Sequence, residues 1–143
     1  MFVNHGAKVY AVAKIIHSMI RVLELPRSLA FYDDCFGLKP AHTLDFPSFS
    51  LVYLRNAEND QEIELTLNKD RTEPYTHGDG YGHVAVCVPD AAAERARIVE
   101  RGYQPNDMKE FRADDGTLIA RYFFIQDPDG YKIEVLERHG HYQ

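Results

Sequence analysis

The chain has few of the residues on which small, cross-linked proteins depend. Its 143 residues include two cysteines, Cys35 and Cys87, and no tryptophan. Two cysteines this far apart form no CxxC metal-binding pattern, and they are too few for a disulfide framework. The sequence therefore excludes disulfide-rich secreted scaffolds and cysteine-based zinc modules. Two reduced thiols are typical of a cytoplasmic protein, and we expect that location.

Long hydrophobic runs are also missing. The most apolar stretch near the N-terminus, YAVAKIIHSMIRV, is interrupted by Lys14, His17 and Arg21. A membrane-spanning helix needs about 20 predominantly apolar residues, and a signal peptide needs an apolar centre followed by a small-residue cleavage site. This stretch has neither feature. We expect no signal peptide, no membrane span and no membrane partner.

Positive charge is scarce as well. The chain has 16 lysines and arginines against 22 aspartates and glutamates, a formal net charge of −6. Non-specific binding to nucleic acid needs a basic face that displaces phosphate counterions, so we expect no nucleic-acid partner. A small anionic ligand remains compatible, because one arginine in a pocket can bind it. The hydrophobic fraction of 45% and the aromatic fraction of 12% are typical of one globular domain with a hydrophobic core.

The first half of the chain predicts a strand, a helix and two further strands. These segments are residues 15–21, 23–38, 49–56 and 61–68. In the first strand, the alternation places His17, Met19 and Arg21 on one face and Ile16, Ile20 and Val22 on the other. The helix has Pro26 near its start and Gly37 as its stop signal.

The second half predicts the same order of elements. Its segments are residues 82–88, 90–102, 117–126 and 131–137. Asp90 is a favourable N-cap for the helix, Gly102 ends it, and the DPDG sequence predicts a turn between the last two strands. We therefore predict an α+β fold in one compact domain, with room for another short strand in each half. An N-terminal arm covers residues 1–14, and the two modules cover 15–76 and 77–143.

The repeat places four chemically useful residues at matching positions. His17 and His83 open the first strand of each module, and Glu64 and Glu134 lie in the last strand of each. Glu64 follows His17 by 47 residues, and Glu134 follows His83 by 51. Any one of them could be a structural histidine or a carboxylate on a solvated sheet face. Their recurrence in both modules favours a shared role.

Two imidazoles and two carboxylates would form a mixed nitrogen and oxygen site. Such a donor set suits Zn, Ni, Co, Mn or Fe better than Ca or Mg, and it does not select among the five. An ion held there would polarise a carbonyl or stabilise an enediolate. A neighbouring carboxylate would then serve as base for a proton alpha to that carbonyl.

Six blocks of the sequence, taken in order, resemble the glyoxalase I family (lactoylglutathione lyases) of the vicinal oxygen chelate superfamily. The blocks are HSMIRV, FYDDCFGL, FSLVYL, EIELTLN, GYGHVAV and DPDGYKIEV. The resemblance extends over about residues 15 to 137. It implies two βαβββ modules, the glyoxalase/bleomycin-resistance/dioxygenase type of fold. It also implies a homodimer with its sites at the interface, to which each chain contributes one His–Glu pair per site.

The same resemblance implies roles for individual residues. The implied metal ligands are His17, Glu64, His83 and Glu134. Arg21 and Asn68 match the family's glutathione contacts, and the alternation of the strands independently places Arg21 on the His17 face and Asn68 on the Glu64 face. The compact length resembles the class that prefers Ni or Co, with Zn possible.

The implied reaction converts the hemithioacetal of methylglyoxal and glutathione to S-lactoylglutathione through an enediolate. We expect Glu134 to be the base, with Glu64 as the corresponding group for the other diastereomer. An extradiol dioxygenase of the same superfamily would need an iron site of two histidines and one carboxylate. The additional carboxylate of Glu64 argues against a dioxygenase.

One segment departs from the family pattern. The family usually has a glycine-rich stretch with a basic residue where this chain reads FRADDG, with Asp114 and Asp115. Lys109 or Arg112 would then have to replace the usual carboxylate anchor. Three further possibilities stay open at this point: a related thiol conjugate as substrate, an acyl-CoA epimerase-like enzyme, or a metal-free protein that binds an antibiotic.

Overall fold

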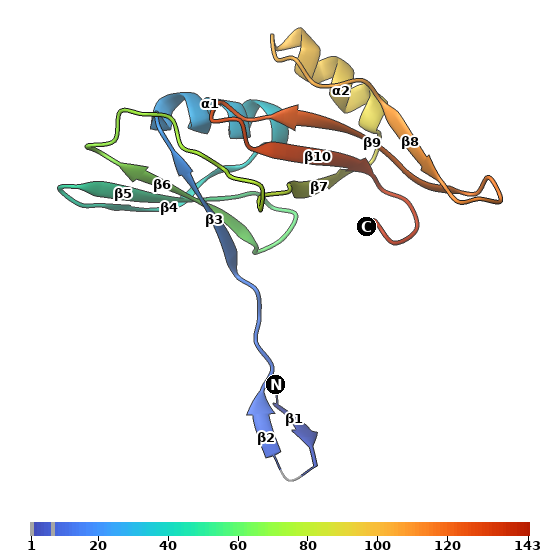
Figure 1. Cartoon of the computed structure of the whole chain (residues 1–143), viewed down its shortest axis with the longest axis horizontal. Coiled ribbons are helices and arrows are strands. Elements are labelled where there is room, and N and C mark those ends of the chain that lie inside the picture. The colour runs from blue at the N-terminus through green and yellow to red at the C-terminus, as the bar shows by residue number, and fades with distance from the viewer. Residues whose placement is uncertain (1, 7) are drawn as a thin grey trace.

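The first module forms a four-stranded sheet with one helix. The computed structural model describes residues 2–6 and 8–143 of the chain. The module's elements are β3 (His17–Val22), α1 (Leu25–Phe36), β4 (Lys39–Asp45), β5 (Phe49–Arg55) and β6 (Glu62–Asn68). The strands are ordered β3-β6-β5-β4, so the first strand of the module pairs with its last (Figure 1). That pairing is parallel, and the other two pairings in this sheet are antiparallel.

The second module repeats this arrangement. Its elements are β7 (Val84–Val88), α2 (Ala91–Glu100), β8 (Lys109–Arg112), β9 (Leu118–Gln126) and β10 (Lys132–Glu137). The sheet order is β7-β10-β9-β8, again with the first and last strands parallel. The predicted α+β fold of two βαβββ modules is confirmed. Strands β4 and β8 are the additional strands for which the sequence left room; β8 is short, whereas β4 is as long as β5 and β6.

Local sequence signals place the helix ends. Pro26 lies in the first turn of α1, and Gly37 caps its C-terminus at φ 63°, in the left-handed region that glycine adopts most readily. The Asp90 carboxylate caps α2 by accepting a hydrogen bond from the N–H of Ala93 at 3.0 Å. α2 itself ends at Glu100, two residues earlier than Gly102 predicted.

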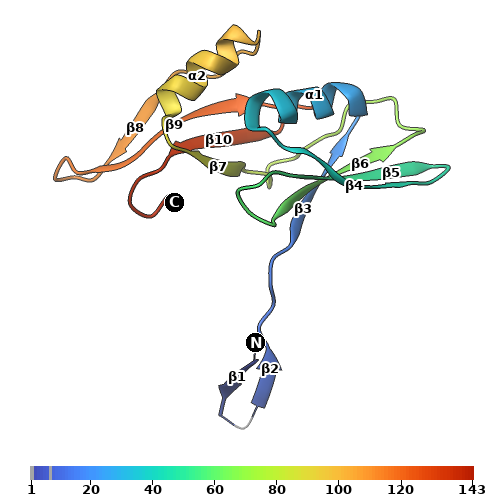
Figure 2. The same cartoon turned by 180° about the vertical axis from the view of Figure 1, so that it is seen from behind.

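The two helices lie on the same side of the sheets, and the opposite side has no helix (Figures 1 and 2). One hydrophobic cluster joins both helices to both sheets; it includes Val22, Phe31, Leu54, Ile98, Phe123 and Val135. Because side chains alternate along a strand, the residues between these core positions face the helix-free side. That side is where the predicted site residues lie.

The DPDG sequence forms a turn that also ties the second module to the first. The Tyr32 hydroxyl donates to the Asp127 carboxylate at 2.7 Å, and the N–H of Leu23 donates to the Asp129 carboxylate at 3.0 Å. The Tyr131 hydroxyl donates to the backbone carbonyl of Arg21 at 2.9 Å. Burial raises the pKa of Asp127, and burial next to that carboxylate raises the pKa of Tyr32. We call this set of contacts the DPDG clasp.

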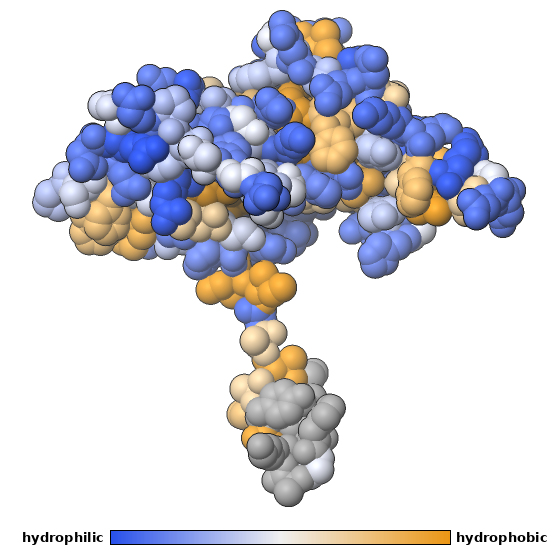
Figure 3. All heavy atoms as spheres, in the orientation of Figure 1, coloured by the Kyte–Doolittle hydropathy of each residue, from blue (hydrophilic) through white to orange (hydrophobic). Residues whose placement is uncertain are grey.

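The N-terminal arm contains a hairpin that the sequence did not predict. Strands β1 (Phe2–His5) and β2 (Lys8–Ala11) pair antiparallel and project away from the two sheets (Figure 1). The neck between this hairpin and β3 has a hydrophobic surface, to which Val12 and Ile15 contribute (Figure 3). Ile16, which the alternation grouped with Ile20 and Val22, lies just before β3 and is 57% exposed, unlike those two buried residues. No helix in the described ranges is long and apolar enough to cross a membrane.

Candidate metal centre

The first His–Glu pair lies on the helix-free face of the first sheet. In β3, Ile20 and Val22 are buried against the helices, and His17 therefore faces the other way. Glu64 lies on the adjacent parallel strand β6 and is only 8% exposed. His17 Nε2 is 3.4 Å from Glu64 Oε2. Two residues 47 positions apart in sequence are thus brought into direct contact by the parallel pairing of the module's first and last strands.

The second pair occupies the matching place in the second module. His83 lies immediately before β7, which begins at Val84 and not at His83 as the sequence suggested. Glu134 lies on β10 and is in register with Ala85 on the parallel strand β7. His83 Nε2 is 3.9 Å from Glu134 Oε2, so this pair is more open than the first. Val86 and Val88 pack against the hydrophobic cluster, on the side opposite to this pair.

Each pair has an aromatic neighbour that the sequence analysis missed. The Tyr53 hydroxyl donates to Glu64 Oε1 at 2.8 Å, and its ring meets the His17 ring edge-on with centroids 5.4 Å apart. This hydrogen bond to Glu64 raises the pKa of Tyr53. Phe124 meets the His83 ring in the same edge-on manner at 5.3 Å. Strand alternation already places Tyr53 on this face, but only the β5–β6 register sets it opposite Glu64.

The spacing within each pair suits a transition metal. Two ligand atoms that each lie about 2.1 Å from one ion, at octahedral or tetrahedral angles, are about 3.0 to 3.4 Å apart. The first pair falls in this range, and the second needs to close by only about half an ångström, which side-chain rotation supplies. In the ranges that the structure describes, however, no three His, Cys, Asp or Glu side chains are grouped closely enough to hold one ion. The chain by itself offers two half-sites.

The residues expected to contact glutathione lie at the other end of the first sheet's helix-free face. Arg21 is exposed on β3, and the Asn68 side-chain amide donates to the Tyr75 hydroxyl at 3.1 Å. Asn68 also lines an open hollow of about 530 Å³. Three basic side chains line the same hollow: Arg27, Lys69 and Arg71. The sequence analysis missed them, because their proximity depends on how α1 begins beside the end of β6.

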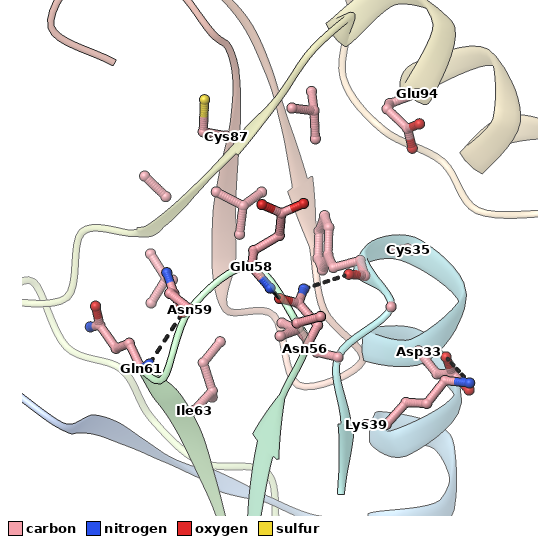
Figure 4. A pocket seen from close by; sticks show the side chains of 18 of the residues that line it. Asp33, Cys35, Lys39, Asn56, Glu58, Asn59, Gln61, Ile63, Cys87 and Glu94 are labelled. Carbon is pink, nitrogen blue, oxygen red and sulfur yellow. Dashed lines mark hydrogen bonds and ion pairs between the residues drawn. The ribbon is translucent and has the colours of Figure 1, made fainter. Parts of the chain in front are cut away.

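A larger cleft, of about 1120 Å³, lies elsewhere. It is bounded by the end of α1, the β5–β6 turn and strand β7, with Glu58 and Asn59 on one wall and Cys87 on another (Figure 4). None of the six predicted site residues lines it, and neither does any histidine of the described ranges. This cleft therefore lacks the imidazole donors of the predicted metal centre, despite its size.

Comparison with known proteins bears on what these half-sites do. Residues 14–135 match the family described as the Glyoxalase/Bleomycin resistance protein/Dioxygenase superfamily. The chain belongs to this superfamily. The lactoylglutathione lyase of Salmonella typhimurium is 39% identical over 130 residues, which cover 87% of this chain and 92% of that enzyme. The lactoylglutathione lyase of Haemophilus influenzae is 38% identical with the same coverage.

Solved structures that resemble this chain include glyoxalase I enzymes. The trypanothione-dependent glyoxalase I of Leishmania major has a TM-score of 0.71 at 32% identity, covering 88% of this chain and 87% of that one. Glyoxalase I from Zea mays has a TM-score of 0.76 at 27% identity, covering 89% of this chain and 45% of that one. This member of the superfamily is accordingly an enzyme, a lyase of the glyoxalase I type.

The FRADDG segment, where we expected a basic anchor from the resemblance to the glyoxalase I family, lies at the β8–β9 connection. Here the Arg112 guanidinium is paired with the Glu110 carboxylate at 2.7 Å, so it is already engaged. The Asp115 carboxylate accepts the N–H of Thr117 at 2.9 Å and shapes the turn. Lys109, at the start of β8, is exposed. Of the two basic residues suggested as replacement anchors, Lys109 is the better candidate, and its role stays a prediction.

Proposed function

We propose that the chain is a metal-dependent glyoxalase I that isomerises the hemithioacetal of methylglyoxal and glutathione to S-lactoylglutathione. The observation that carries the proposal is the recurrence of a His–Glu pair, His17 with Glu64 and His83 with Glu134, on the helix-free face of each module. Similarity to lactoylglutathione lyases over 87% of the chain supports the same reaction.

The proposal includes a homodimer. One chain offers two donors in each half-site and, among its described residues, no group of three. A complete four-ligand site therefore requires a second copy, with the His17–Glu64 half-site of one chain facing the His83–Glu134 half-site of the other. Neither α1 nor α2 covers the face of the sheets on which the half-sites lie (Figure 2).

A divalent transition metal would be held by the two imidazoles and the two carboxylates. A bound ion of this kind acts as a Lewis acid for the substrate oxygens. We favour Ni or Co, with Zn as the alternative, because the chain is similar in length to compact bacterial lyases. The donor set is compatible with all three metals.

Glu134 is our proposed catalytic base. Its carboxylate would take the proton from C1 of the hemithioacetal and return it to C2, with an enediolate between the two transfers. The C1–H bond and the C1 hydroxyl O–H bond break, while a C2–H bond and a C2 hydroxyl O–H bond form. The reaction is therefore an isomerisation that needs no oxidant or reductant. Glu64 would perform the corresponding transfer for the other diastereomer.

Glutathione would be anchored by its charged groups. The Arg21 guanidinium can bind a carboxylate through two hydrogen bonds, and the Asn68 amide can bind a peptide group. In the hollow beside Asn68, Arg71 offers a guanidinium to a second carboxylate, whereas Arg27 and Lys69 are already paired with Asp129 and Asp45. We also propose a cytoplasmic location, which the two free cysteines support.

The decisive experiment is an assay of thioester formation from methylglyoxal and glutathione with the metal-free protein reconstituted with Ni, Co, Mn or Zn. We expect activity with at least one metal and its loss on chelation. A His83→Ala variant provides the matched control, because it should retain the fold and lose activity with every metal. Absence of thioester formation with all four metals would contradict the proposed function, and activity only toward an acyl-CoA substrate would favour the epimerase-like alternative.

A further inference from the structure

The two half-sites carry an aromatic residue at the same structural position. Tyr53 of β5 is in register with Glu64 of β6, and Phe124 of β9 is in register with Glu134 of β10. Each ring meets its histidine edge-on, with interplanar angles of 73° and 82°. The half-sites thus match in strand pairing and ring placement, and this pair of residues differs by one hydroxyl group.

That hydroxyl group changes the environment of one carboxylate only. The Tyr53 hydroxyl donates to Glu64 Oε1 at 2.8 Å, while Glu64 Oε2 faces His17 at 3.4 Å. Glu64 therefore has one oxygen held and the other available for a metal. Within the described ranges, the Glu134 carboxylate accepts no hydrogen bond, and its Oε2 is 3.9 Å from His83.

We propose that Tyr53 is a positioning residue that holds Glu64 as a metal ligand while Glu134 acts as base, and that Phe124 gives Glu134 no such restraint. This inference rests on the proposed function. A carboxylate held by a charge-assisted hydrogen bond at one oxygen loses rotational freedom. The carboxylate opposite a phenyl ring has no such restraint. The asymmetry makes Glu134 the principal base and Glu64 the less mobile of two residues that the fold makes equivalent.

The test removes the hydroxyl group from one half-site and adds it to the other. Partners that orient a metal ligand typically change metal affinity or activity by about 10- to 100-fold when removed. In Tyr53→Phe, we expect the dissociation constant of the reconstituted metal to rise by about that factor, measured by competition with a chromophoric chelator. The visible absorption of the Co-substituted variant should also shift, because the Glu64 geometry changes.

The reciprocal variant is Phe124→Tyr, which offers Glu134 the same hydroxyl donor. Here we expect kcat at saturating metal to fall by about 10-fold or more, because a restrained carboxylate transfers the proton poorly. Its metal dissociation constant should stay at the wild-type value or decrease. A wild-type kcat in Phe124→Tyr would contradict the division of roles.

Tyr103→Phe is the matched control. The Tyr103 hydroxyl also donates to a carboxylate at 2.8 Å, that of Asp34, between the modules and outside both half-sites. A purely structural role for Tyr53 predicts that both Tyr→Phe variants lower thermal stability and leave metal affinity unchanged, and that result would overturn the inference. An inactive wild-type protein that nevertheless shows the expected order of metal affinities would contradict only the proposed reaction.

Discussion

The connection between the last two strands is short in both modules, but its hydrogen-bond partners differ between the two. In the first module, residues 56–61 hydrogen-bond mainly with one another: the side chain of Asn59, for example, accepts the N–H of Gln61 at 3.2 Å. In the second module, Asp127 accepts from Tyr32 of α1, and Asp129 accepts from the N–H of Leu23, which directly follows β3. Repeated modules can therefore keep their strand order while one copy of a turn is adapted to join them.

The half-sites show the same kind of divergence on a smaller scale. Both keep a histidine, a glutamate and an aromatic ring, but only Glu64 receives a hydroxyl donor. Divergence is thus concentrated at single side chains, while the backbone register stays common to both modules. Comparing equivalent positions in the two modules is accordingly the most direct way to assign roles.

The largest expected effect separates the two carboxylates. Glu134→Gln should lower kcat by about 10²- to 10⁴-fold, because an amide cannot accept the proton that a general base removes. Glu64→Gln should instead act mainly through metal binding, since the new amide oxygen can still accept the Tyr53 hydrogen bond but brings no charge to the ion. Steady-state kinetics and metal content, measured on both variants, distinguish these effects. Full turnover in Glu134→Gln would exclude it as the base.

A second prediction compares the two turns through stability. Asp127→Ala removes the acceptor for the Tyr32 hydroxyl and for the backbone N–H groups of Asp129 and Tyr131. Leaving these buried donors without a partner should lower the free energy of unfolding by about 3 kcal/mol. Asn59→Ala, in the equivalent turn of the first module, should change it by less than about 0.5 kcal/mol. Urea unfolding of both variants provides the measurement, and equal effects would argue against the clasp.

The smallest effect concerns pH. Burial raises the pKa of Asp127 in the folded state, so the native protein holds this proton more tightly than the unfolded chain does. Its stabilising contribution is full below the unfolded pKa and declines as the pH rises through the folded pKa. The stability difference between wild type and Asp127→Asn should therefore shrink from about pH 3 toward neutrality.

Glu110 provides the opposite control for that measurement. Hydrogen bonds from Arg112 and Arg121 lower the pKa of this exposed carboxyl group. Its contribution is present above the unfolded pKa and declines as the pH falls through the folded one. The difference between wild type and Glu110→Gln should thus grow with pH. Parallel slopes for the two variants would contradict the assigned direction for Asp127.

Much of the fold was predictable from local signals. Alternating strands, Pro26, Gly37 and the Asp90 cap determined the order of elements and most of their bounds. The contact between His17 and Glu64 was also within reach, because the repeat relates it to His83 and Glu134. These features depend on periodicity and on the matching of two halves, which a single sequence contains.

The rest depends on relations between segments that local patterns do not encode. The position of Tyr53 beside Glu64 depends on strand register, and the contact between Asp127 and Tyr32 depends on how the modules pack. The DPDG sequence predicted a turn but not the target of its carboxylates. The N-terminal hairpin has a single glycine, Gly6, as its turn signal, and its strands have no partner sheet to reveal them.

The DPDG clasp has a consequence for how the protein is made. Tyr32 and Asp127 are 95 residues apart, and Arg21 and Tyr131 are 110 apart. During synthesis, the first module therefore leaves the ribosome with the start of α1 and the Tyr32 hydroxyl still lacking their partners. These groups acquire partners only after the turn at residues 127–131 has emerged. The loop that then closes is about 100 residues long, and the entropy cost of closing a loop rises only slowly with its length. The first half of the chain is thus translated early, but its contacts with the clasp form only after the second half has been made.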